Sequence, residues 1–340
     1  MKTYPQPIIV LIVLLITTGA AAQTEHLIAG RTMGTTYHIK VVGGDVEDLS
    51  GLREKIERRL LDLNQVFSTY IKDSEISRFN ALQRAGERFE VSGDFMQVMR
   101  VARDIHRLSE GAWDGTVNPL VDLWSFGPTK RKPGMPPADA IKALLPRIGF
   151  DRIRIEEPNF LLKELASVTL DLNAIAKGYA VDQVSRLLDS AGYKSYLVEI
   201  GGEIYAAGFR PDGQRWRVGI NRPQKDANFN EVYRVVAVFN QAFATSGDYR
   251  NFFEMDGVRY SHVIDPRSGY PVSNGVVSVS VIADNCTLAD GLATAIMIMG
   301  AEKGIALVNR LKNVECFIVV EKQDGRLINY ASAGFATLNQ

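Results

Sequence analysis

Two short segments, far apart in the chain, place acidic side chains among residues too small to cover them. The first, from Asp171 to Asp182 (DLNAIAKGYAVD), also holds Lys177. The second, from Ala289 to Ala295 (ADGLATA), holds Asp290 and Thr294. Neither pattern is typical of a packed core or of a solvated face. Open carboxylates suit a divalent cation and a nearby lysine suits phosphate, so the two segments predict an enzyme that acts on a phosphate ester.

The spacing of Asp290 and Thr294 favours a cation site. Residues four apart share one face of a helix, and two oxygens there could hold a magnesium ion, which keeps its waters and needs few protein oxygens. The small neighbours, such as Gly291, would let another segment come close. The structural alternative is an aspartate in the first helical turn, favoured by the helix dipole, and a threonine bonded back to a carbonyl.

The residues of the first segment have structural alternatives too. Asp171 stands where a strand is expected to pass into a helix, so it could serve as an N-cap. Lys177 would by default be solvated, although the N–H groups at a helix start favour anions. Asp182 is interpreted as a surface carboxylate without a role.

A third group of polar residues lies between positions 244 and 269. Its Ser246-Gly247-Asp248 and Asp265-Pro-x-x-Gly269 pieces are typical of turns. His262 is one of four histidines in the chain, and the turn after it could expose it. At this stage a satisfied core histidine and a catalytic histidine are equally open.

The elements that must position these residues follow from hydrophobic spacing. We predict helices over residues 50–67, from an N-cap at Ser92 to a stop at Gly111, over 173–190 and over 288–311, and a short helix capped by Asp139. Strands are expected at 196–200 and 203–207 as a hairpin, then at 215–220, 232–239, 241–245, 276–282, 316–320 and 327–330. Strands adjacent in sequence favour antiparallel pairing, so the predicted fold class is α+β: largely antiparallel sheets packed with helices.

Composition and missing motifs exclude several function classes. The chain of 340 residues is 46% hydrophobic and balances 39 basic residues against 39 acidic ones, so no net field favours nucleic acid. The sequence has no Cys-x-x-Cys, His-Glu-x-x-His or Gly-x-Ser-x-Gly, which argues against zinc hydrolysis and an esterase elbow. It also lacks a P-loop and Gly-x-Gly-x-x-Gly.

The N-terminal segment predicts export. Residues 1–22 combine Lys2, a nine-residue apolar run from Ile8 to Ile16, and Ala20-Ala21-Ala22 before Gln23, as in a signal peptide. The run is shorter than the roughly 20 apolar residues of a membrane span, although an uncleaved anchor is the alternative. No cysteine lies near the cleavage site, so a lipoprotein is disfavoured. Cys286 and Cys316 are the only cysteines, interpreted as buried apolar residues with a single disulfide as the alternative.

Eight segments, in order, resemble the ApbE family of FAD:protein FMN transferases over almost the whole mature chain. They are Met33–Tyr37, Phe67–Tyr70 with Asp73–Asn80, Trp113–Trp124, Asp171–Asp182, Glu199–Glu203, Ser246–Tyr249, Ser261–Pro266 and Ala289–Ala295.

The resemblance implies a Mg²⁺-dependent enzyme that takes FAD as substrate. FMN would be joined through its phosphate to a threonine or serine of an acceptor protein, and AMP would leave. The acceptor is expected in a membrane redox complex such as sodium-pumping NADH:quinone reductase. Residues 23–340 would form one domain, with the FAD site between two lobes, in a periplasmic protein. By motif match, the resemblance implies that Mg²⁺ would be held by Ala174, Asp290 and Thr294. His262 would take the proton from the acceptor hydroxyl. The residues that would contact FAD are Met33, Tyr70, Ala112, Trp113, Asp114, Asp171, Lys177 and Ile264.

Some points stay open. Ala174 has no side-chain oxygen, which leaves only its carbonyl for the metal. An FAD pyrophosphatase, in which water replaces the acceptor hydroxyl, and a non-catalytic periplasmic flavin-binding protein are the alternative functions.

Overall fold

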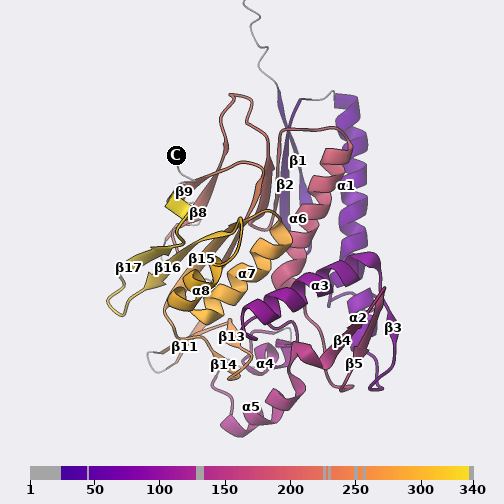
Figure 1. Ribbon diagram of the computed structural model, residues 1–340, viewed down its shortest axis with the longest axis vertical. Helices are drawn as coiled ribbons and strands as arrows, with labels where there is room; N and C mark the ends of the chain where they lie inside the picture. The colour runs from indigo at the N-terminus through magenta and orange to yellow at the C-terminus, as the bar shows by residue number, and fades with distance from the viewer. Residues whose placement is uncertain are drawn as a thin grey trace, which may run out of the picture.

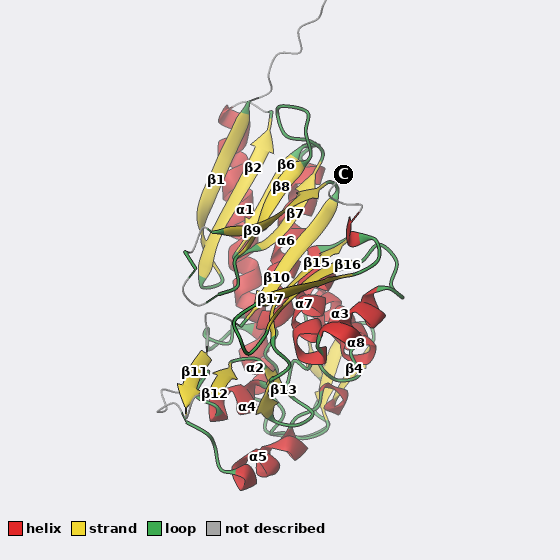
Figure 2. Ribbon diagram, turned by 90° about the vertical axis from the view of Figure 1, so that its left-hand side faces the viewer, coloured by secondary structure: helices red, strands yellow, loops and turns green. Residues whose placement is uncertain are grey.

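An antiparallel sheet of eight strands forms the centre of the protein (Figures 1 and 2). The computed structural model describes residues 24–43, 46–127, 134–224, 227–228, 231–248, 252–255 and 258–336. The strand order is β1-β2-β6-β7-β10-β15-β16-β17. All pairings in the sheet are antiparallel, so the predicted α+β class is confirmed. The bounds are β1 Glu25–Thr32, β2 Thr35–Val42, β6 Tyr196–Ile200, β7 Glu203–Ala207, β10 Gln241–Gly247, β15 Val276–Ala283, β16 Glu315–Glu321 and β17 Leu327–Ala331.

Side chains of the sheet alternate between two cores, as the period of two along a strand requires. On β16, Cys316 and Ile318 point into the core shared with the helices, whereas Phe317 and Val319 point into a second core. A separate hairpin, β8 (Trp216–Asn221) with β9 (Val232–Val238), covers that second core. β8 and β9 match the strands predicted at 215–220 and 232–239, and they form a two-stranded sheet of their own that covers one face of the main sheet.

Helices α6 (Asn173–Ser190) and α7 (Cys286–Met299) pack against each other and against the sheet, and α1 (Val46–Phe67) packs on α6 (Figure 1). The prediction of one long helix over 288–311 is wrong. Gly300 has φ +85, which breaks the helix, and α8 (Ala301–Val308) follows. The expected cap of α3 (Gly93–Leu108) is confirmed, since the Ser92 Oγ accepts a hydrogen bond from the Phe95 N–H at 3.2 Å.

Shorter elements surround one end of this assembly, at the bottom of Figure 1. The expected cap at Asp139 is wrong, because the short helix α5 has Pro137 at its N-cap and Asp139 inside its first turn. These elements are α2 (Glu75–Asn80), α4 (Asn118–Leu123), α5 (Ala138–Leu144), two 3₁₀ turns (Leu145–Arg147 and Phe150–Arg152), the sheet of β3 (Phe89–Glu90), β5 (Phe160–Lys163) and β4 (Ile153–Glu156), and the pairs β11 (Phe252–Met255) with β12 (Val258–Ser261) and β13 (Ile264–Asp265) with β14 (Tyr270–Pro271).

Three further expectations concern the whole chain. Cys286 and Cys316 are buried and free, as interpreted from the sequence. The predicted signal peptide, residues 1–22, lies outside the described residues, and the single domain over 23–340 and its division into two lobes stay predictions. No helix in the described part of the chain is both long and apolar enough to cross a membrane.

Candidate flavin and magnesium site

One pocket of about 780 Å³ brings together most of the residues that the sequence singled out. Eleven of the twelve predicted site residues line it, and Met33 is the one that does not. They come from five separate segments of the chain, so only the tertiary fold assembles them. The eleven are Tyr70, Ala112, Trp113, Asp114, Asp171, Ala174, Lys177, His262, Ile264, Asp290 and Thr294.

The deep part of the pocket depends on a close crossing of α6 and α7. A Cβ atom on Gly178 would lie 2.3 Å from the carbonyl oxygen of Cys286 and 2.8 Å from the Cβ of Asp290. The Gly178 N–H donates to Asp290 Oδ2 at 3.0 Å. Glycine is therefore required here because the two helices touch through backbone.

Asp182 fixes the start of α7, and its interpretation as a surface carboxylate is wrong. It is buried, and its carboxylate accepts hydrogen bonds from the N–H groups of Cys286 (2.7 Å) and Thr287 (2.9 Å) and from the Thr287 hydroxyl. An aspartate so placed satisfies N–H groups that a helix start leaves without partners. Asp182 thus ties α6 to the helix that presents Asp290.

Lys177 lies between two carboxylates. Its Nζ is 3.1 Å from Glu203 Oε1 and 3.8 Å from Asp290 Oδ2. Glu203 and Asp290 are almost fully buried, whereas the Lys177 side chain keeps 27% of its exposure. Burial alone would lower the pKa of Lys177, but the carboxylates of Asp290 and Glu203 outweigh it and raise that pKa. Lys177 therefore stays positively charged, as an anion-binding residue must.

The same burial raises the pKa of both carboxyl groups. For Asp290 desolvation is opposed by Lys177 and by the Gly178 N–H. For Glu203 desolvation is opposed by Lys177 and reinforced by the negative charge of Asp290. Two acids and one base thus share a site in which a further positive charge would stabilise the ionised acids.

Asp290 and Thr294 lie one turn apart on α7, as predicted, but neither structural alternative holds. The helix begins at Cys286, so Asp290 is beyond its first turn, where no acidic residue lies. The Thr294 Oγ1 is 3.1 Å from the Ser246 Oγ on β10. Ala174 lies in the first turn of α6 and also lines the pocket.

Asp171 lines the pocket without being the N-cap, which is Leu172, and the strand expected directly before it is absent from the described residues 164–170, since β5 ends at Lys163. Its Oδ1 accepts the Asn173 N–H at 2.9 Å, and its own N–H donates to the Gly115 carbonyl at 2.7 Å. Burial raises the pKa of Asp171, and the Asn173 hydrogen bonds oppose that shift.

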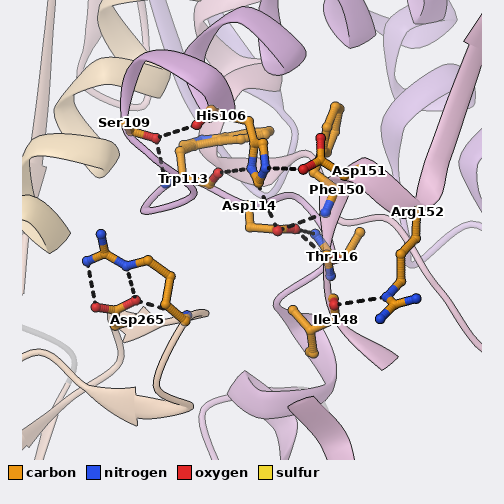
Figure 3. A network of polar contacts seen from close by, with 12 residues as sticks. His106, Ser109, Trp113, Asp114, Thr116, Ile148, Phe150, Asp151, Arg152 and Asp265 are labelled. Carbon is orange, nitrogen blue, oxygen red and sulfur yellow. Dashed lines mark hydrogen bonds and ion pairs between the residues drawn. The ribbon is translucent and has the colours of Figure 1, made fainter. Parts of the chain in front are cut away.

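A polar network holds the segment Ala112–Asp114 (Figure 3). The Asp114 carboxylate accepts hydrogen bonds from the N–H and hydroxyl of Thr116 and from the Phe150 N–H. His106 Nδ1 is 2.8 Å from the Trp113 carbonyl, which can only accept, so this nitrogen carries the proton. The buried indole Nε1 of Trp113 has no hydrogen-bond partner among the described residues.

Two predicted flavin contacts, Tyr70 and Met33, lie outside the buried part of the site. Tyr70 is 77% exposed and lines the pocket, which leaves its ring open to a planar ligand. Met33 and Gly34 form the two-residue turn between β1 and β2, with φ +46 and +74. Such turns need two positive φ values, and a methionine there is unusual.

His262 lies between β12 and β13, and Ile264 begins β13. The neighbouring Val263 N–H donates to the Ser261 Oγ at 3.1 Å, and the Val263 carbonyl accepts from the Val272 N–H at 2.9 Å. The His262 ring lies at the pocket, 6.3 Å from the ring of Phe126. The structure therefore places it at the pocket wall rather than in the core of the sheet.

Sequence reasoning assigned no role to Glu203, Ser246 or Asn80, which also line the pocket. The side chain of Asn80 pairs with both main-chain groups of Leu170, at 2.8 and 2.7 Å. The signal for Glu203 was its place after Gly201-Gly202, where φ is +65 and +104. A pair of glycines that turns a strand back can aim the next side chain into a site.

The chain matches known proteins over nearly its full length. The model of the ApbE family matches residues 33–318. An FAD:protein FMN transferase of Vibrio cholerae is 44% identical over 92% of both chains, and one of Haemophilus influenzae is 37% identical over 94% of both.

Solved structures agree with the sequence relatives. The flavin transferase ApbE of Vibrio cholerae superimposes with a TM-score of 0.84 at 41% identity, covering 93% of this chain and 99% of that one. The apo flavinyl transferase ApbE of Pseudomonas stutzeri gives 0.84 at 38% identity, covering 93% and 97%. The chain therefore belongs to the ApbE family of flavin-transferring enzymes.

Proposed function

We propose that this chain transfers FMN from FAD to a threonine or serine hydroxyl of an acceptor protein, in a reaction that needs magnesium and releases AMP. The observation that carries the proposal is the convergence of Lys177, Glu203 and Asp290 in the pocket that also holds every predicted FAD contact except Met33. The relatives' names supply the reaction class.

The donor set fits a magnesium ion. The described residues contain no group of three or more His, Cys, Asp or Glu side chains that could hold a metal. Asp290, the Thr294 hydroxyl and the main-chain carbonyl of Ala174 would instead offer three hard oxygens, which suits an ion that keeps several waters. In a regular helix the Gly178 N–H would donate to the carbonyl of Ala174. Here the Gly178 N–H donates to Asp290, which leaves the Ala174 carbonyl more available to a metal ion. The bound ion would neutralise charge on the diphosphate as the phosphorus is attacked.

The residues of the pocket would bind and orient FAD. Lys177 would neutralise further diphosphate charge. Trp113 lines the pocket and would contact the ligand, and the exposed face of Tyr70 would stack on the flavin. These contacts position the reacting phosphorus, which in phosphoryl transfer is a large part of catalysis.

His262 would act as the base. A histidine side chain exchanges its proton near neutral pH. In the proposed step a ring nitrogen of His262 takes the hydroxyl proton of the acceptor. The acceptor oxygen forms a bond to the FMN phosphorus, and the bridging P–O bond breaks so that AMP leaves with the electron pair. Atoms and charge then balance without a further reactant.

The test combines the purified chain with FAD, Mg²⁺ and a candidate acceptor domain. We expect the acceptor to gain the mass of FMN less one water, and EDTA to abolish the gain. AMP release at the same rate without acceptor would instead indicate the pyrophosphatase. Bound FAD that survives magnesium unaltered would indicate a flavin-binding protein.

The place of action is part of the proposal. We propose that the chain is exported to the periplasm, on the basis of the N-terminal segment, and that its acceptor is a subunit of a membrane redox complex, on the basis of the family resemblance. Fractionation of cells that express the full chain tests the first point.

A further inference from the structure

Among the described residues, Glu203 has the one carboxylate oxygen that is buried without a hydrogen-bond partner. Its Oε1 lies 3.1 Å from Lys177 Nζ, but its buried Oε2 has no hydrogen-bond partner among the described residues. Asp182 and Asp114, nearby buried acids with structural roles, each accept hydrogen bonds on both oxygens. Because a buried oxygen without a donor is unfavourable, Glu203 is not explained as an anchor of the fold.

The geometry gives Glu203 a different task. Lys177 has two carboxylate neighbours and lies nearer to Glu203, at 3.1 Å, than to Asp290, at 3.8 Å. An ammonium group that closed onto Asp290 would neutralise the carboxylate that a divalent cation needs. Glu203 comes from β7 and Asp290 from α7, so the two carboxylates that compete for the ammonium belong to different elements.

We propose that Glu203 is a positioning residue that holds Lys177 off Asp290 and thereby keeps Asp290 available to the divalent cation. The inference rests on the proposed function, because it takes Asp290 as a cation ligand. It predicts that the length of the Glu203 side chain, and not only its charge, sets the affinity for the cation.

The test measures Mn²⁺ binding to the full chain by electron paramagnetic resonance, without FAD or acceptor. Glu203→Asp keeps the charge but shortens the reach, so Lys177 should close onto Asp290. We expect Glu203→Asp and Glu203→Gln to weaken Mn²⁺ binding at least tenfold, within the range of 10- to 100-fold seen for residues that orient metal ligands. In a Lys177→Met background, Glu203→Asp should cost threefold or less, because no ammonium remains to compete.

Three results would overturn the inference. If Glu203→Asp bound Mn²⁺ like the wild type, the negative charge at this position would matter and the length of the side chain would not. An equal loss in both backgrounds would make Glu203 a ligand or a structural residue, and an unchanged Glu203→Gln would give it no role. Glu156→Gln removes a paired carboxylate on β4, outside the pocket, and is the matched control. Asp290→Asn separates the two proposals, since wild-type Mn²⁺ affinity there would sink the proposed metal site itself.

Discussion

At the scale of single residues, the site works by contrasts in burial. Asp290 and Glu203 are almost fully buried beside a lysine that keeps a quarter of its exposure, and Tyr70 is mostly exposed. Buried charges bind strongly because little water screens them, and the exposed ring can accept a flat ligand. The pocket therefore offers both buried charges and an open aromatic ring, which the proposed flavin substrate would need.

His262 gives the clearest prediction at this scale. Replacing it with alanine should slow flavin transfer by roughly 10²- to 10⁴-fold, the usual contribution of a general base. FAD affinity, measured by quenching of flavin fluorescence, should change little, because the base acts on the acceptor. Equal losses in rate and FAD affinity would instead make His262 a binding residue.

Asp248, at the end of β10, predicts a pH effect on stability. Burial raises the pKa of Asp248 to about 6, although Arg259, at 2.9 Å, opposes the shift. A raised pKa in the folded state means that the folded chain holds the proton more tightly. The contribution of Asp248 to the free energy of unfolding is therefore complete below about pH 4 and is lost as the pH rises through about 6.

The Asp248→Asn variant isolates that effect. Its free energy of unfolding, measured in urea, should rise relative to the wild type by roughly 2–3 kcal/mol between pH 4 and pH 7. The sign follows because asparagine stays neutral while the wild-type carboxylate ionises. A difference that is flat with pH would show that Arg259 fully compensates the buried charge.

At the scale of elements, the crossing of α6 and α7 decides the site. Gly178 brings the helices into backbone contact, and Asp182 binds the first N–H groups of α7. Lys177 and Asp290 are neighbours in space only because this crossing is close. The hairpin of β6 and β7 then adds Glu203 from the sheet.

Gly178→Ala tests the crossing. The added methyl would meet the Cys286 carbonyl at 2.3 Å, so α6 and α7 must separate. We expect the free energy of unfolding to fall by about 1–3 kcal/mol, as for overpacked cores, and Mn²⁺ affinity to fall with it. Gly51→Ala in α1 is the control, since nothing lies within 4 Å of its new methyl; it should stabilise by roughly 0.5–1 kcal/mol. Equal melting curves for the two variants would contradict the close contact.

At the scale of the whole molecule, two cores on opposite faces of one sheet support a pocket beside it. β15 is buried along its whole length because both of its faces are covered. The pocket draws on segments from Thr69 to Ile298, so ligands should stabilise the fold as a unit. Binding to the folded chain alone adds about 2.7 kcal/mol at a ligand concentration of 100 times Kd.

The corresponding prediction concerns FAD and magnesium together. We expect the Tm to rise more with both ligands than with the sum of each alone, because under the proposed function each ligand would add to the binding site of the other. EDTA should remove the excess, measured by calorimetry without acceptor. Strictly additive shifts would mean that the two ligands bind independently.

The sequence alone determined the residue types and the local elements. The periodicity of α1, the Ser92 cap and the pairing of β6 with β7 follow from short-range rules, and eleven predicted residues lie in one pocket. Only the tertiary structure decided which neighbours each residue has. The sequence indicated a surface position for Asp182 and no role for Glu203. The burial of Asp182 and the position of Glu203 beside Lys177 both depend on contacts between residues more than 20 positions apart along the chain. Periodicity reports which face of an element is buried, but not against what.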